Sequence, residues 1–234
     1  MVKRHLKRIS APKTWPLKRK KEVFVKRPFP TGNTIENSLP LVVIFRDLLK
    51  KVKTGRELNY VIINKGIYIN GKKARSTKDS AGLMDVISIP ETNEHFRVLI
   101  NGAGLLTVLK IDEKEANVIP LMVRDKSKLK QGKTQLNFAN GHNFIVDKDE
   151  YKSGEVLLYD YNNKKTTQHL KLEKGSMVYF TRGRYIGKTA RVEEIKKDSI
   201  VYKRDGETFE VPKDSSKEYS FLIGTKEPLI KLAD

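Results

Sequence analysis

Residues 41–89 carry the pattern that most restricts the fold of this chain, because two short helical segments lead directly into a tight hairpin. The first segment reads LPLVVIFRDLLKKVK, and its apolar stripe consists of Ile44, Phe45, Leu48, Leu49 and Val52. This spacing predicts one amphipathic helix with a single buried face. The basic residues of the segment fall off the stripe, so we expect them on the solvent side.

The second helical segment begins at Thr54, which is followed three residues later by Glu57. This is the spacing of a capping box, in which the two side chains satisfy backbone N–H groups that the first turn leaves unpaired. Gly66 stands where a left-handed residue would end the helix. The expected buried face consists of Leu58, Val61 and Ile62.

A hairpin follows the two helical segments. Residues 67–69 form a short β-type run, and the Asn-Gly pair at 70–71 is a strong signal for a two-residue hairpin turn. The Lys-Lys pair at 72–73 comes directly after the turn. Residues 85–89 alternate between the two faces of a strand, so they can close a small sheet with the 67–69 strand. A basic helix beside a basic turn indicates a small RNA-docking module.

The net charge of +19 is concentrated near the N-terminus. Residues 1–27 hold eleven Lys or Arg against one acidic residue, the first 90 residues carry +15, and the remaining 144 carry only +4. This asymmetry indicates a polyanionic partner at the N-terminal end, because a charge that serves solubility would be spread more evenly. We expect no membrane partner, since no apolar run approaches ~18 residues and the basic segment lacks an amphipathic apolar face.

The basic residues 1–33 are interrupted by four prolines, which prevent a long helix. The charge density predicts that this segment orders only against its partner. Trp15, Phe24 and Phe29 lie among the cations, so we expect stacking on bases or ribose to accompany phosphate neutralisation. The alternative interpretation is a disordered, solvated tail.

From residue 95 onwards the sequence consists of short β-type segments separated by turn residues, with further hairpin signals at Asn140-Gly141 and Asp205-Gly206. The segments SMVYF, TARVEEI, SIVYK and TFEVP surround a Gly-rich turn and have the pattern of a small barrel. We therefore predict a multidomain α+β chain. Its parts are a basic N-terminal extension (1–40), a small α/β RNA-binding domain (41–92), a β-rich central domain (93–172) and a small β-barrel with a C-terminal tail (173–234).

No pattern in the sequence nominates a catalytic residue. RGRYIGKT at 182–189 is one residue too short for a phosphate-binding P-loop, because three residues rather than four separate Gly183 from Gly187. No Gly-x-Ser-x-Gly elbow and no His-Glu-x-x-His segment occurs. The acidic cluster at 147–150 lies near His142, but interleaved lysines favour a solvated turn over acid–base chemistry.

Metal, cofactor and small-molecule sites are not expected either. The four histidines are isolated from one another, and the absence of Cys excludes disulfides and thiolate metal ligands. The N-terminus carries charges without the apolar region of a secretory signal. These observations favour a non-enzymatic, cytoplasmic protein without a cofactor, a metal or a small-molecule substrate.

Three basic clusters outside the extension are candidates for phosphate contacts. In the first cluster, Arg46, Lys50 and Lys53 have i, i+4 and i+7 spacing, which would put all three on one face of the expected 41–53 helix. The second cluster is the lysine pair after the Asn-Gly turn, and the third surrounds the turn between Gly183 and Gly187. Each cluster taken alone is equally compatible with a solvated basic surface, whereas three clusters and a basic extension together favour RNA.

Two segments resemble known RNA-binding families. The 41–89 stretch resembles the S-four RNA-binding fold through its helix pair, its Ile-Asn-Gly-Lys turn at 69–72 and the Asp-Val-Ile segment at 85–87. Residues 175–195 resemble a KOW motif. The matching positions are Val178, Gly183, Gly187 and Val192, whereas Ala190 stands where many KOW sequences have a third glycine.

A longer resemblance extends over nearly the whole chain. It is carried by HLKR at 5–8, APKTW at 11–15, Arg27-Pro28, LPL at 39–41 and AGLMDVISI at 81–89. These segments, and the order of the parts, resemble the S-four-e ribosomal proteins of the archaeal and eukaryotic small subunit, with a length closer to the archaeal branch. The resemblance implies a structural constituent of the small ribosomal subunit that binds rRNA, neighbours other ribosomal proteins and has no catalytic activity.

The clusters and the resemblance together predict a set of RNA contacts. The predicted contacts are Lys3, Arg4, Lys7, Arg8, Lys13, Trp15, Lys18, Arg19, Lys20, Lys21, Arg27, Arg46, Lys50, Lys53, Arg56, Asn70, Lys72, Lys73, Arg182, Arg184, Tyr185 and Lys188. One alternative is an RNA-modifying enzyme of the pseudouridine synthase type, but the Gly-Arg-Leu-Asp-type segment that such an enzyme needs does not follow residue 90. A second alternative, a KOW-bearing transcription factor, gives no reason for the basic extension.

Overall fold

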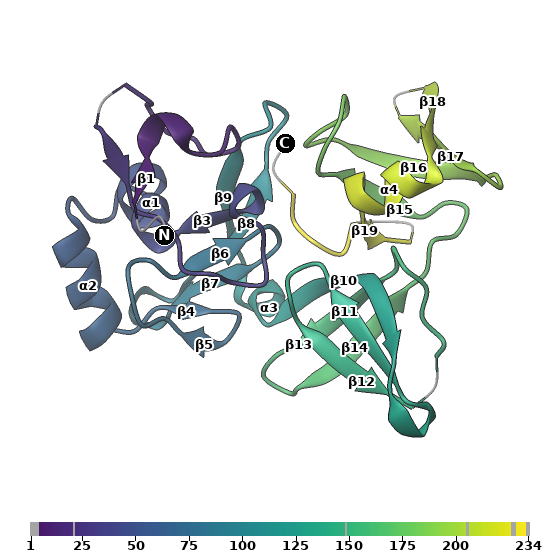
Figure 1. Ribbon diagram of the computed structural model, residues 1–234, viewed down its shortest axis with the longest axis horizontal. Helices are drawn as coiled ribbons and strands as arrows, with labels where there is room; N and C mark the ends of the chain where they lie inside the picture. Colours follow the sequence, from purple (N-terminus) through teal and green to yellow (C-terminus); the bar gives the residue numbers. More distant parts are fainter. Residues whose placement is uncertain (1–4, 21, 148, 205, 226–227, 233–234) are drawn as a thin grey trace. The chain divides into compact units, whose positions relative to one another are not determined.

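The computed structural model of the chain describes residues 5–20, 22–147, 149–204, 206–225 and 228–232 (Figure 1). The chain divides into two compact units. The first comprises residues up to 100 together with 105–119, and the second comprises 101–104 and the residues from 120 onwards. Most of the regular structure is β-strand arranged in several sheets, and the helices are few and short.

The first unit begins with short elements and ends with longer strands. Its elements are β1 (Leu6–Lys7), η1 (Arg8–Ser10), β2 (Phe24–Val25), η2 (Ile35–Asn37), β3 (Ser38–Pro40), α1 (Leu41–Val43), η3 (Ile44–Leu48), α2 (Gly55–Asn64), β4 (Tyr68–Ile69), β5 (Lys72–Lys73), β6 (Ser80–Gly82), β7 (Val86–Ile89), η4 (Pro90–Thr92), β8 (Glu94–Ile100), β9 (Leu106–Ile111) and α3 (Glu113–Ala116).

The second unit is built almost entirely of strands. Its elements are β10 (Val118–Lys128, whose first two residues belong to the first unit), η5 (Lys130–Gly132), β11 (Thr134–Phe138), β12 (Asn143–Val146), β13 (Val156–Asp160), β14 (Lys165–Leu170), β15 (Met177–Phe180), β16 (Thr189–Ile195), β17 (Ser199–Arg204), β18 (Glu207–Pro212), α4 (Lys213–Tyr219) and β19 (Ser220–Gly224).

The main sheet of the first unit has the strand order β5-β4-β7-β8-β9, and β3 pairs separately with β6. Apolar side chains of α1 and α2 are buried, and so are those of the sheet strands β7 and β8. Because β7 pairs antiparallel with β8 from Val86–Arg97 to Ile89–Glu94, the sheet continues past residue 92, where we predicted a domain boundary. The sheet therefore joins the predicted RNA-binding domain to the first strands of the predicted central domain.

The first predicted helix is shorter than its apolar pattern indicated. Only residues 41–48 are helical, and the last five of these, Ile44–Leu48, form a π-type turn. The amide of Leu49 donates to the Ile44 carbonyl and the amide of Lys51 to the Phe45 carbonyl. These hydrogen bonds span more residues than those of an α-helix, so the last turn is wider and the helix ends. Lys50 then adopts a left-handed conformation, with φ of 53°. The prediction of one helix through residue 53 was wrong.

The local signals of the next segment are confirmed. Thr54 accepts a hydrogen bond from the Glu57 amide at 3.2 Å, and the Glu57 carboxylate accepts one from the Thr54 amide, which completes the capping box. Of the expected buried face, Leu58 and Ile62 are buried, whereas Val61 is half-buried. Gly66 has the left-handed conformation expected after the helix, with φ of 78°.

The second unit contains two five-stranded sheets, ordered β12-β11-β10-β13-β14 and β18-β17-β16-β15-β19. The Asn-Gly signal at 140–141 falls between the paired strands β11 and β12, as predicted. Gly206 lies between the paired strands β17 and β18, whereas Asp205 lies outside the described residues. In the second sheet, burial raises the pKa of the Tyr202 hydroxyl, which lies 2.5 Å from the Ser216 hydroxyl.

Candidate nucleic-acid interface

The N-terminal extension is folded against the first unit, contrary to the expectation that it orders only with a partner. β1 pairs antiparallel with β2, and the Leu106 amide at the start of β9 donates to the Thr14 carbonyl at 2.8 Å. The Phe29 amide donates to the Lys78 carbonyl at 3.0 Å. These backbone contacts hold the extension in place without any nucleic acid.

Trp15 belongs to the hydrophobic core of this unit. Its side chain is 2% exposed, and its Nε1 donates to the Ile35 carbonyl at 3.1 Å. A ring that is covered on both faces cannot stack on a base, so the prediction that Trp15 contacts RNA was wrong. The residue instead fixes the path of the extension.

Two of the predicted arginine contacts also have structural roles. Arg8 is 3% exposed, and its guanidinium donates to the Glu22 carboxylate at 2.6 Å. Arg19 donates to three backbone carbonyls at 2.9–3.0 Å, those of Ile9, Ala11 and Pro12. Because Arg8 is buried and the Arg19 guanidinium is engaged by backbone carbonyls, we reassign Arg8 and Arg19 from RNA contacts to positioning residues of the extension.

The remaining basic residues of the extension present their charges to solvent. The exposed members of the predicted set are Lys7, Lys13, Lys18, Lys20 and Arg27. Lys3, Arg4 and Lys21 lie outside the described residues. The Arg19 hydrogen bonds fold the chain around residues 9–12, so Lys18 and Lys20 on either side of Arg19 are held on an ordered segment.

The predicted row of cations along the first helix does not form, because Lys50 and Lys53 lie beyond its end. Arg46 makes two hydrogen bonds to Asp47, at 3.1 and 2.9 Å, and this hydrogen bonding raises the pKa of the guanidinium. Lys50, Lys53 and Arg56 are exposed, the last in the first turn of α2. These three cations therefore follow the end of η3 and the start of α2 rather than one helix face.

The hairpin between β4 and β5 is positioned by a buried carboxylate. Asn70 has φ of 50° and Gly71 has φ of 73°, as a type I′ turn requires. The side-chain amide of Asn70 donates through Nδ2 to the Asp85 carboxylate at 2.8 Å, and its Oδ1 accepts from the Val86 backbone N–H at 2.8 Å. Because both ends of this amide are used, we reassign Asn70 from an RNA contact to a positioning residue.

Asp85 joins three separate segments through one side chain. It accepts hydrogen bonds from Asn33 at 3.2 Å, from Asn70 at 2.8 Å and from the Gly82 amide at 2.6 Å. The extension, the hairpin and β6 are thus connected at a single carboxylate. Lys72 and Lys73 follow the turn on β5, and both side chains are exposed.

The turn between β15 and β16 forms the third basic cluster. Tyr185 stacks on Phe209 with ring centroids 3.8 Å apart, so one face of the tyrosine ring is already covered. The Arg184 guanidinium lies 5.9 Å from the centroid of the same ring. Arg184 and Lys188 are exposed, and Arg182 is half-buried.

Gly187 in this turn has no room for a side chain. It has φ of 72°, and a Cβ atom there would lie 2.4 Å from the Asn101 carbonyl carbon and 2.5 Å from the Gly102 nitrogen, both within the second unit. We expect Gly187→Ala to lower the free energy of unfolding by about 2–4 kcal/mol, because left-handed strain and a backbone clash add together. Urea denaturation followed by circular dichroism measures this.

Gly183→Ala is the matched control for that prediction. Gly183 has φ of 84°, but the nearest atom to its added Cβ is Tyr219 Cδ2 at 3.8 Å. Only the left-handed strain remains, so the expected loss is about 1–2 kcal/mol. Equal losses in the two variants would contradict the close approach at Gly187.

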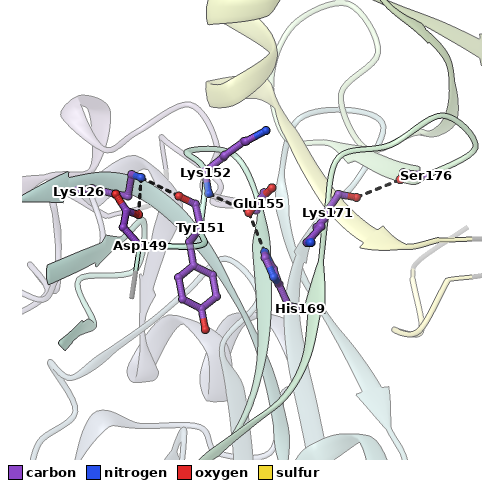
Figure 2. A network of polar contacts seen from close by, with 8 residues as sticks. All are labelled: Lys126, Asp149, Tyr151, Lys152, Glu155, His169, Lys171 and Ser176. Atoms are coloured by element: carbon purple, nitrogen blue, oxygen red, sulfur yellow. Dashed lines mark hydrogen bonds and ion pairs between the residues drawn. The ribbon is translucent and has the colours of Figure 1, made fainter. Parts of the chain in front are cut away.

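The polar network around the 149–152 loop was not identified from the sequence (Figure 2). The His169 Nε2 atom lies 2.7 Å from the buried Glu155 carboxylate, which also accepts from the Lys152 amide at 2.8 Å. Lys126 donates to Asp149 at 2.6 Å and to the Tyr151 carbonyl at 2.7 Å. Lys126 lies in β10, Glu155 directly precedes β13 and His169 lies in β14, so these contacts tie the loop to three strands (Figure 2). The network is therefore structural.

The described part of the chain contains neither a cluster of metal ligands nor a membrane-spanning helix. No group of three or more His, Asp or Glu side chains is arranged to hold a metal ion there. None of the helices there is long and apolar enough to cross a membrane.

Comparison with known proteins gives matches over nearly the entire chain. The family model described as Ribosomal family S4e matches residues 92–166, and the model of the RS4NT (NUC023) domain matches residues 2–30. The small ribosomal subunit protein eS4 of Methanocaldococcus jannaschii is 34% identical, with 98% of each chain covered. That of Methanosphaera stadtmanae is 35% identical, with 98% of this chain and 96% of the relative covered.

A solved structure is also similar. The crystal structure of the 30S ribosomal protein S4e from Thermoplasma acidophilum matches with a TM-score of 0.69 and 29% sequence identity. The match covers 81% of this chain and 96% of that one.

Proposed function

The chain belongs to the ribosomal S4e family, and from that premise we propose that it is a structural constituent of the small ribosomal subunit that binds small-subunit rRNA. The observation that carries this proposal is the full-length similarity to relatives named small ribosomal subunit protein eS4. The family is structural and non-enzymatic. Neither alternative, the pseudouridine synthase type or the KOW-bearing transcription factor, has support among these relatives.

The exposed cations supply the chemistry that rRNA binding needs. Phosphate contacts by Lys and Arg dominate affinity for nucleic acid, and an RNA that is already folded is recognised largely through its backbone and shape. We assign these contacts to the cations that are exposed and retained from the sequence prediction. They are Lys7, Lys13, Lys18, Lys20, Arg27, Lys50, Lys53, Arg56, Lys72, Lys73, Arg184 and Lys188.

The parts of the chain have separate roles in this proposal. The helix pair and the β4–β5 hairpin act as an S-four-like module, and the β15–β16 turn acts as a KOW-type contact. The continuity of the β7–β8–β9 sheet favours extending the S-four-like module through β9 rather than ending it at residue 92. The N-terminal extension packs on this module and adds its lysines to the same binding surface.

Neighbouring ribosomal proteins are the second class of partner, and the ribosome in the cytoplasm is the proposed location. The test is sedimentation of a cell lysate through a sucrose gradient after a moderate-salt wash. We expect the protein to comigrate with small subunits, because contacts to phosphates from several segments survive that wash together. Recovery of the protein only at the top of the gradient would overturn the proposed function.

A further inference from the structure

Three exposed apolar side chains lie on or directly beside the two-stranded β1–β2 ribbon near the N-terminus. Ile9, Val23 and Phe24 are 75%, 67% and 54% exposed. Phe24 and Val23 lie beside the first strand, because Lys7 is directly opposite Phe24 and the Arg8 amide donates to the Val23 carbonyl at 2.9 Å; Ile9 follows Arg8 in the chain. A single exposed apolar residue needs no explanation, but three together on an ordered ribbon indicate a binding surface.

The register of the ribbon defines which side chains share its outer face. Residues directly opposite each other in an antiparallel pair point to the same side, so Lys7 and Phe24 lie together. The other pair, Leu6 and Val25, faces the core, and Val25 is buried. The His5 ring lies 5.7 Å from the Phe24 ring, tilted by 52°. We call His5, Lys7 and Phe24 the ribbon face.

The charge around the ribbon face favours a polyanion over a protein. Glu22 is the one acidic residue in positions 1–27, and its carboxylate is held by Arg8. Lys7, Lys20 and Lys26 are exposed, and no ion pair neutralises them among the residues that the structure describes. Lysine is depleted in the cores of protein–protein interfaces, whereas an aromatic ring beside lysines matches a base beside its phosphate.

We propose that the ribbon face binds one unstacked base of an RNA strand on the Phe24 ring, with Lys7 on an adjacent phosphate. This inference rests on the proposed function, and it names a contact that phosphate binding alone does not provide. Phe24 rather than Trp15 is then the stacking residue of the extension. Phe29 differs from Phe24 because the Lys78 ammonium already lies 5.4 Å from its ring centroid.

The test measures binding of the full chain to a single-stranded 12-nucleotide RNA and to the same strand made fully abasic. Stacking on an aromatic side chain is sequence-tolerant, and its loss typically weakens binding by about 5- to 100-fold. We expect Phe24→Ala to produce a loss of this size on the intact strand and no loss on the abasic strand. The log–log salt slope should stay unchanged, because the slope reports phosphates and not bases.

Two further variants separate aromatic stacking from a plain apolar contact and from a general effect of the extension. Phe24→Leu keeps apolar area but has no aromatic face, so it should bind as weakly as Phe24→Ala. Phe29→Ala, a second exposed aromatic in the same extension, should bind as the wild type does. Circular dichroism of each variant confirms the fold, which we expect to persist because the Phe24 side chain is largely exposed.

Specific outcomes overturn the inference. Wild-type affinity in Phe24→Leu would indicate an apolar contact, and wild-type affinity in Phe24→Ala would remove the ribbon face from RNA binding. If Phe24→Ala binds both RNAs normally yet no longer comigrates with small subunits, the occupant is a neighbouring protein. Failure of the wild type to bind either RNA or rRNA would instead contradict the proposed function itself.

Discussion

Replacing Trp15 by alanine should lower the free energy of unfolding by about 3–5 kcal/mol, the range found when a buried tryptophan or phenylalanine is truncated. The indole is 2% exposed, and its removal leaves both a cavity and an unpaired Ile35 carbonyl. Because Trp15 is hydrogen-bonded to Ile35 and buried in the core, the loss should destabilise residues 5–20 and 22–40 together.

The measurement is urea denaturation followed by far-ultraviolet circular dichroism, with Lys13→Ala as the control. Lys13 is exposed and lies two residues away, so its replacement should change stability by less than about 0.5 kcal/mol. In the wild type, the fluorescence of this single tryptophan reports directly on the extension. If the fluorescence midpoint came at a much lower urea concentration than the circular dichroism midpoint, the extension would unfold independently. Trp15 would then contribute little to global stability.

Reversing both charges after the hairpin turn, in a Lys72→Glu/Lys73→Glu variant, should weaken binding to small-subunit rRNA by about 10- to 100-fold near 0.15 M salt. Both lysines are exposed on β5, and Asp85 and Asn70 hold the turn that precedes them. The log–log salt slope should become shallower by about 1.4–1.8, at ~0.7–0.9 for each of the two lost phosphate contacts. Filter binding over a range of salt concentrations gives both quantities.

The matched control is Lys164→Glu/Lys165→Glu. It reverses two adjacent lysines at the hairpin between β13 and β14, and these were not predicted as contacts. The net charge changes equally in the two variants, so equal losses of affinity would indicate a general field effect and contradict docking by the hairpin. An Arg46→Glu/Lys50→Glu variant is less informative, because it also breaks the Arg46–Asp47 pair.

Signals that depend on neighbouring residues could be predicted from the sequence. The capping box at Thr54 and the type I′ turn at Asn70 are set by side chains and dihedral angles within a few residues, and both were correct. The exposed lysines of the hairpin follow from that turn. The full-length resemblance to the S-four-e family identified the chain, although no single local pattern would have done so.

Features that depend on distant residues were missed. The Trp15 indole donates to the Ile35 carbonyl, and the preceding Thr14 carbonyl accepts from the Leu106 amide at the start of β9; no local pattern contains that information. The helix that begins at Leu41 buries residues 41–45 without interruption, and the Leu41 amide donates to the Asp79 carbonyl. A periodicity argument assumes one buried stripe, so it extended this helix too far.

The hydrogen bond between Thr14 and Leu106 also determines when the extension can fold during synthesis. Thr14 leaves the peptidyl transferase centre first, but its backbone partner in β9 is added 92 residues later. At roughly 5–20 residues per second, that interval lasts on the order of 5–20 s. Throughout this interval the most basic segment of the nascent chain lacks its backbone partner in β9. This chain therefore has a defined interval in which a chaperone that masks lysines would protect it.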